Sequence, residues 1–203
     1  MRKIILFAFV SILILTSCNQ KKPLKTIDNL KAGIKCETTT SLMYAAFAKK
    51  AKTEGHETIS KLFNAVSKSE GIHSENLKRV LIGLGQKMDK FKPEIEVKNT
   101  EQNIQVAIDG ETYETKTMYP LFFKSARTEG ALSAVEIFTW EYDTELKHLA
   151  YFQKALEAFE DKTENTLSLD YAICPVCGNI FEYKALDQKC SFCGISKKRF
   201  IKY

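Results

Sequence analysis

Apolar and polar side chains recur with the period of an α-helix over most of the chain, from about residue 31 to residue 161. Glycine is rare in this stretch, and a proline-bearing break falls near Lys90–Glu94. The pattern favours a mainly α protein. It predicts four helices, at about residues 31–53, 57–84, 101–128 and 131–160.

The two halves of this helical region repeat each other at an offset of 75 residues, so that Phe47–Gly55 aligns with Phe122–Gly130. Both segments end in Thr-Glu-Gly, which is typical of a short turn, and each repeat therefore predicts an antiparallel helical hairpin. Residues 85–100 would then form one long crossover between the hairpins. A four-helix bundle with one long crossover has the ferritin-like arrangement.

The same offset relates two Glu-x-x-His motifs, Glu70 with His73 and Glu145 with His148. A carboxylate and an imidazole three residues apart share one helix face and can reach a common point in a bundle core. The third histidine, His56, has no such partner, and we interpret it as exposed and without a role.

Three further glutamates complete a set of metal ligands: Glu37 on the first helix, and Glu111 with Glu114 on the third. Two Glu-x-x-His helices with glutamates from the other two are the inventory of ferritin-like di-iron proteins. Carboxylates about 4 Å apart repel by ~4 kcal/mol at an effective dielectric near 20, and two cations remove that repulsion. The ligands suit iron or manganese, with zinc as a common substitute. Each glutamate taken singly is more typical of a solvated helix surface.

Tyr44 and Tyr119 follow Glu37 and Glu111 by seven and eight residues, which is two helical turns along the same face. Each is either plain core, or a phenol that hydrogen-bonds a ligand carboxylate from just outside the ligand set. Both interpretations stay open.

The chain changes character after a polar linker at residues 162–170. Two Cys-x-x-Cys-Gly motifs, Cys174 with Cys177 and Cys190 with Cys193, predict a tetrathiolate metal site in residues 171–203. So short a segment cannot bury a core large enough to fold alone, so the metal supplies much of its stability. The spacing does not separate iron from zinc, and two disulfides are the remaining alternative for an exported chain.

The N-terminus predicts export. Basic residues precede an apolar run at residues 4–15, which is too short to cross a ~30 Å hydrocarbon core. The sequence Leu-Thr-Ser-Cys that follows resembles the lipobox of bacterial lipoproteins. We expect a signal peptide at residues 1–17, a lipid on Cys18 and a polar tether at 18–30. An uncleaved signal anchor is the alternative.

The amino-acid composition argues against two classes of protein, nucleic-acid binders and disulfide scaffolds. The 203 residues include 30 basic and 25 acidic side chains, a net charge of +5, and the chain after residue 17 would carry +3. This balance gives no electrostatic footprint for nucleic acid. Six cysteines are too few for a disulfide scaffold.

These residues together resemble the rubrerythrin family, in which a ferritin-like di-iron bundle precedes a rubredoxin-like iron domain. The resemblance covers about residues 31–203, with the bundle at 31–161, and implies that His73 exchanges with Glu114 as one iron changes oxidation state. The second cysteine motif lacks the usual proline, and Cys36 has no family role. The implied di-iron ligands are Glu37, Glu70, His73, Glu111, Glu114, Glu145 and His148, and the implied mononuclear iron ligands are Cys174, Cys177, Cys190 and Cys193.

The resemblance implies an NADH-linked peroxidase that reduces hydrogen peroxide to water in oxidative-stress protection. An external donor protein would supply electrons through the rubredoxin-like iron, often across a head-to-tail homodimer. The protein would be an exported lipoprotein, anchored by its lipid at the periplasmic face or the outer membrane. The alternatives are a non-catalytic, iron-sequestering lipoprotein with a structural zinc, or a ferroxidase that uses O2.

Overall fold

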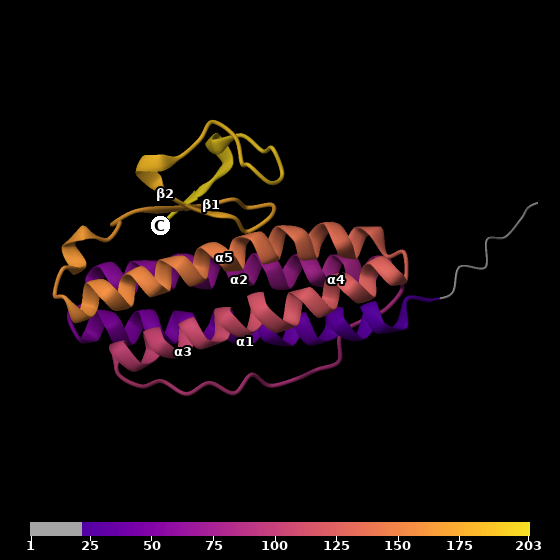
Figure 1. The fold of residues 1–203 in the computed structure, drawn as a ribbon, viewed down its shortest axis with the longest axis horizontal. Coiled ribbons are helices and arrows are strands. Elements are labelled where there is room, and N and C mark those ends of the chain that lie inside the picture. The colour runs from indigo at the N-terminus through magenta and orange to yellow at the C-terminus, as the bar shows by residue number, and fades with distance from the viewer. Residues whose placement is uncertain (1–21) are drawn as a thin grey trace, which may run out of the picture.

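A computed structural model describes residues 22–203, and the predicted signal peptide and Cys18 lie outside the described residues. The structure confirms the mainly α fold, with four long helical segments in a bundle and a small module above them (Figure 1). The third segment is continuous but changes type, because a π-helix at Glu114–Met118 joins α3 to α4. The helices are α1 (Leu24–Thr53), α2 (Glu57–Gly83), α3 (Thr100–Tyr113), α4 (Tyr119–Thr128) and α5 (Leu132–Glu160).

The Thr-Glu-Gly turns close both hairpins and also tie the hairpins to each other. Gly55 and Gly130 adopt positive φ angles of 92° and 69°, which a glycine reaches without strain. Glu129 accepts a hydrogen bond from the backbone N–H of Thr26 at 2.7 Å, and Glu54 accepts one from Thr100 at 2.8 Å. Each turn glutamate therefore caps the first helix of the other hairpin.

The first helix begins earlier than the sequence pattern predicts. Residues 24–30 are helical, and Ile27 and Leu30 are buried in the core beside α2 and α5. The expected tether at 18–30 is therefore wrong from residue 24 onward. The physical reason is the cap from Glu129, which supplies a partner for the N–H groups at the start of the helix.

Aromatic clusters fill the bundle at both ends of its length. One cluster packs Tyr44 against Phe63 and Phe152, with ring centroids 5.7 and 5.2 Å apart. The other packs Tyr119 against Phe122 and Phe138 at 5.8 and 6.2 Å. The repeat relates the two clusters, and the polar centre of the bundle lies between them.

The C-terminal module is built on three short antiparallel strands in the order β2-β1-β3. They are β1 (Tyr171–Ile173), β2 (Ile180–Glu182) and β3 (Ile201–Lys202), with Ala172 opposite Phe181 and Lys202. Figure 1 shows the module over α2 and α5, on the side of the bundle away from the long crossover at residues 84–99. Among residues 22–203, the helices are too polar or too short to span a membrane.

Candidate metal centres

The bundle brings all seven predicted glutamates and histidines into its interior. Each is at most 2% exposed, although a helix surface is the usual place for a glutamate. The residues come from every long segment of the bundle. They are Glu37 on α1, Glu70 and His73 on α2, Glu111 on α3, Glu114 on the π-helix, and Glu145 and His148 on α5.

Six of the seven residues form two overlapping groups. Within each group the potential ligand atoms lie within 4.8 Å of one another, and Glu70 with Glu145 belong to both. One group adds Glu37 and His73, and the other adds Glu111 and His148. Each group would offer one ion the two shared carboxylates together with one further carboxylate and one imidazole.

The short contacts inside this cluster are mostly not hydrogen bonds. The Nδ1 atom of His148 lies 2.6 Å from Glu145 Oε2 and 3.1 Å from Glu70 Oε1, yet none of these contacts has hydrogen-bond geometry. Ten buried oxygen and nitrogen atoms of the cluster and its neighbour Glu141 have no hydrogen-bond partner among residues 22–203. Because unpaired buried polar atoms are costly, this donor set fits cations that would complete it.

Burial and mutual repulsion set the protonation of the metal-free cluster. Burial, with repulsion from Glu70, raises the pKa of Glu111 to about 8. Burial opposes the charged imidazole of His73, but Glu145 and Glu70 outweigh it and raise its pKa to about 10. Burial also opposes the ionised form of Glu70, but the two histidines outweigh it and lower the pKa of Glu70 to about 2. Without cations, the cluster therefore holds extra protons near neutral pH.

The π-helix explains an irregularity in the sequence. Tyr44 follows Glu37 by seven residues, whereas Tyr119 follows Glu111 by eight, and the wider π-turn absorbs the extra residue. The two tyrosines then bond reciprocally across the bundle. Tyr44 donates to Glu111 Oε1 at 2.8 Å, and Tyr119 donates to Glu37 Oε1 at 2.6 Å.

Glu114 is buried beside the cluster but lies outside both ligand groups. Its Oε1 atom accepts a hydrogen bond from the thiol of Cys36 at 3.2 Å, and its Oε2 atom has no partner. Burial, with repulsion from Glu37, raises the pKa of Glu114 well above its usual value. The structure thus gives Cys36 a contact with the cluster that the sequence did not indicate.

Glu141 is a buried carboxylate that sequence reasoning missed. It is fully buried, and its Oε2 atom lies 3.2 Å from the hydroxyl oxygen of Tyr119, whose single proton is directed to Glu37 at the shorter distance of 2.6 Å. Its position one turn before Glu145 was the available signal. The repeat hid that signal, since the residue 75 positions earlier is Val66.

His56 is not near the metal cluster, but it is neither exposed nor idle. It precedes α2, its side chain is half-buried, and its Nδ1 atom lies 2.9 Å from Glu164 Oε1. Its ring also packs against Phe159. It connects the first interhelical turn to the linker that follows α5.

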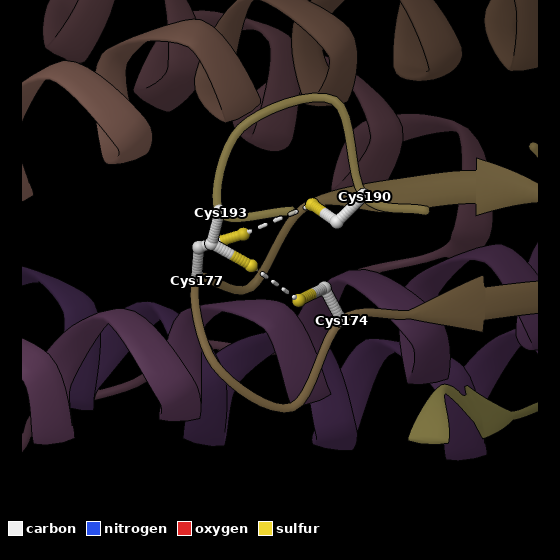
Figure 2. A group of neighbouring side chains, drawn as sticks. All are labelled: Cys174, Cys177, Cys190 and Cys193. Carbon is white, nitrogen blue, oxygen red and sulfur yellow. Dashed lines mark hydrogen bonds between the residues drawn. The ribbon is translucent and has the colours of Figure 1, made fainter. Parts of the chain in front are cut away.

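The four cysteines of the module converge from two loops (Figure 2). Sulfur atoms of Cys174 and Cys193 lie 3.4 Å apart, and those of Cys177 and Cys190 lie 3.5 Å apart. These separations exceed a disulfide bond of about 2.05 Å, so the four thiols are free in this structure. Four sulfurs around one point fit a single tetrahedral metal ion.

The first cysteine loop packs directly on the metal cluster of the same chain. Ser69 donates to the Gly178 carbonyl at 2.6 Å, and Asn76 donates to the Val176 carbonyl at 2.9 Å. A Cβ atom at position 178 would lie 2.5 Å from Cδ2 and Nε2 of His73. Glycine at this position, with a φ of 80°, therefore lets the loop reach the far edge of the His73 ring.

Comparison with known proteins decides the family. The rubrerythrin family profile matches residues 28–156. The chain belongs to the rubrerythrin family. Nigerythrin of Nitratidesulfovibrio vulgaris is 34% identical over 88% of this chain and 86% of its own length. Rubrerythrin-2 of Clostridium acetobutylicum is 29% identical over 86% of this chain and 95% of its own length.

Solved structures agree with this assignment. Nigerythrin in a mixed-valence state has a TM-score of 0.77 at 31% identity, over 88% of this chain and 86% of that one. An open-pore ferritin from Archaeoglobus fulgidus has a TM-score of 0.59 at 15% identity, over 70% of this chain and 88% of that one, and it supports the bundle fold alone.

Membership in the family assigns the metals and the broad chemistry. The cluster of carboxylates and histidines is a di-iron centre, and the four cysteines hold one iron. The protein is an oxidoreductase of the rubrerythrin type. Residues 1–19 match the lipid attachment site of prokaryotic membrane lipoproteins, which indicates an exported protein with a lipid anchor.

Proposed function

We propose that this protein is a peroxidase that reduces hydrogen peroxide to water at the di-iron centre, with electrons delivered through the iron of the four cysteines, the tetrathiolate iron. The contact between the first cysteine loop and His73 carries this proposal. A protein that only stores iron does not need a tetrathiolate iron packed next to its di-iron centre. A protein that delivers electrons to the di-iron centre does need such a neighbour. When bound, the iron pair supplies the two electrons that, with two protons, convert one peroxide molecule into two waters.

The residues of the bundle would hold and orient the irons. Glu70 and Glu145 lie in both ligand groups and would contribute to holding both irons, while Glu37 with His73 and Glu111 with His148 would each help to hold one. The hydroxyls of Tyr44 and Tyr119 fix one oxygen of Glu111 and of Glu37, so that the second oxygen of each faces the cluster. The buried surroundings keep bulk water away from the reacting centre.

Glu114 is the proposed mobile ligand. In this structure His73 belongs to a ligand group and Glu114 is held outside by Cys36. This arrangement corresponds to one side of the exchange between His73 and Glu114 that the family resemblance implies. The π-helix that carries Glu114 supports such motion, since π-turns leave the backbone bonds of a helix less regular.

Electrons would pass within one chain. Cys177 is covalently joined to Gly178, and Gly178 packs on the His73 ring, so one non-bonded contact separates a thiolate ligand from an imidazole ligand. A head-to-tail homodimer, the arrangement expected from the sequence, is therefore not needed for the relay. We further propose that an external donor protein, reduced by an NADH-linked reductase, supplies the electrons, and that the protein is anchored at the periplasmic face or the outer membrane.

The test measures iron content and peroxide consumption by the mature, iron-loaded protein with a reductase and NADH. We expect a Glu70→Ala, Glu145→Ala variant to lose turnover, while Glu75→Ala, an exposed neighbour on α2, keeps it. Full turnover by the double variant contradicts the proposal. A colourless protein with zinc at the cysteines favours the non-catalytic alternative.

A mixing experiment tests the route of the electrons. Chains with Cys174→Ser and Cys177→Ser are combined with chains that carry Glu70→Ala and Glu145→Ala. The proposed relay within one chain predicts no recovery of turnover in the mixture. Recovery of activity would show that electrons cross between subunits.

A further inference from the structure

Lys147 connects the bundle to the cysteine module at a point that the proposed electron path does not use. It precedes the ligand His148 on α5, and its side chain points toward the module instead of the di-iron centre. Its ammonium group donates to Asn179 Oδ1 at 2.6 Å. It also lies 4.6 Å from the ring centroid of Phe181 and 5.0 Å from that of Phe192. Two aromatic faces and an amide therefore hold one cation in place.

Asn179 contacts both Lys147 and a cysteine ligand, Cys190. It follows Gly178 in the first cysteine loop and is fully buried. Because Lys147 has only donors, it fixes the amide with Oδ1 toward the ammonium and Nδ2 toward the second cysteine loop. The Nδ2 atom lies 3.7 Å from Cys190 Sγ and 3.3 Å from Ser191 Oγ. The cation, the amide and the sulfur thus form a continuous hydrogen-bonded chain.

The electrostatics of the pair agree with this geometry. The ammonium group of Lys147 contacts Oδ1 of the same amide whose Nδ2 faces Cys190 Sγ, so a positive charge lies near the negative thiolates and attracts them. The attraction is reciprocal, so a cation here favours the more negative state of the thiolate site. Four thiolates leave the iron site with a charge of about −1 when ferric and about −2 when ferrous.

We propose that Lys147 and Asn179 raise the reduction potential of the tetrathiolate iron, by directing a partly buried positive charge and an N–H donor at Cys190. Hydrogen bonds to cysteine sulfurs and nearby charge are the means by which proteins set such potentials. The pair makes the iron easier to reduce by a weak donor. The reduction potential can be measured on the tetrathiolate iron whether or not the protein is a peroxidase. The effect of that potential on peroxide turnover rests on the proposed function.

The experiment is a redox titration of the tetrathiolate iron in the full, iron-loaded protein, followed by its optical spectrum. We expect Lys147→Met and Asn179→Ala each to move the potential to more negative values. Their effects should not add in the double variant, because both interrupt one chain of contacts. Lys147→Arg keeps the charge and should restore most of the wild-type potential.

Lys154 supplies a matched control. It lies on α5 and its ammonium group is 3.7 Å from Glu182 of the module, but its side chain is 51% exposed and its partner is a carboxylate on β2 instead of an amide that reaches a sulfur. Lys154→Met should therefore leave the potential unchanged. Potentials of Lys147→Met and Asn179→Ala that equal that of Lys154→Met would overturn the proposal.

The sign of the shift separates tuning from simple docking. If Lys147 only held the module on the bundle, its removal would expose the thiolates to water. Water stabilises the more highly charged ferrous site and would raise the potential. A rise in Lys147→Met therefore contradicts the proposal. A negative shift with unchanged peroxide turnover would support the tuning role and count separately against a relay through this iron.

Discussion

The two metal sites of this protein are built in opposite ways. The di-iron ligands project from long helices, between two aromatic clusters that form a core without help from metal. The cysteine ligands project from two loops, one between strands of three residues and the other closed by a single bridge between Lys189 and Ser196. Three of the four cysteines are themselves part of the small buried cluster of the module. The bundle therefore folds without metal and holds its metal ligands in place, whereas the fold of the module depends on the metal that its cysteines bind.

Removal of the metals should separate the two regions most strongly. We expect chelation, or Cys174→Ser with Cys190→Ser, to unfold the module, because it then loses the ion that joins its two loops and its strands are too short to fold alone. The bundle should keep its helices. Circular dichroism would report the helix content, and limited proteolysis would cut after residue 161. Loss of most helical signal on chelation would contradict this division.

Glycine-to-alanine substitutions in the two cysteine loops should sharpen the comparison. Gly178 and Gly194 have similar φ angles of 80° and 72°, so each substitution costs roughly 1–2 kcal/mol of backbone strain in the free energy of unfolding. Only Gly178 faces the bundle, where a Cβ would clash with His73, whereas nothing lies within 4 Å of a Cβ at Gly194. Gly178→Ala should therefore also slow peroxide-driven oxidation of the tetrathiolate iron, by roughly tenfold or more.

Rapid mixing with peroxide, followed by the optical change of the reduced tetrathiolate iron, measures this rate. Gly194→Ala serves as the control for backbone strain. Equal rates in the two variants would mean that the contact with His73 does not carry the electrons.

The metal-free bundle should also lose stability as the pH rises. The pKa of His73 is about 10 in the folded protein against 6.5 as reference, so its stabilising contribution is complete below pH 6.5 and is lost as pH rises through 10. The pKa of Glu111 is about 8 against 4.5, so between these pH values the acid ionises in the unfolded chain but stays protonated in the folded protein, and stability falls as pH rises. Both groups predict a melting temperature that falls from about pH 6 to about pH 9.

Iron should reverse this trend, because metal binding requires deprotonated ligands and strengthens as pH rises. Thermal melts of the metal-free and iron-loaded protein across this range provide the measurement. A metal-free melting temperature that rises with pH would show that the cluster does not hold the extra protons inferred from its geometry.

The sequence predicted what the repeat and the cysteine spacing encode. Glu70, His73, Glu145 and His148 could be found because local spacing and the offset of 75 residues agree. The four cysteines could be found because their spacing is itself the signature of a metal site. These signals are local, and the helices and loops that carry them preserve their geometry.

The features that escaped prediction depend on contacts between distant segments. Val66 stands at the repeat position of Glu141, and the neighbour of this carboxylate, the hydroxyl of Tyr119 at 3.2 Å, comes from another helix. The contact of Asn179 with Lys147 joins residues 32 positions apart across two structural units. The early start of α1 depends on Glu129, 103 residues from Thr26. The hydrophobic pattern of a single segment cannot predict which residue of a distant segment will contact it.

The reciprocal caps described above give the bundle the character of a symmetric dimer held in one polypeptide. Glu54 of the first hairpin closes a helix of the second, and Glu129 of the second closes a helix of the first, as in an isologous interface between identical subunits. Joining the halves in one chain lets them diverge. Cys36, Glu114 and Lys147 have no matching residue in the opposite half, and each lies beside one of the two iron sites.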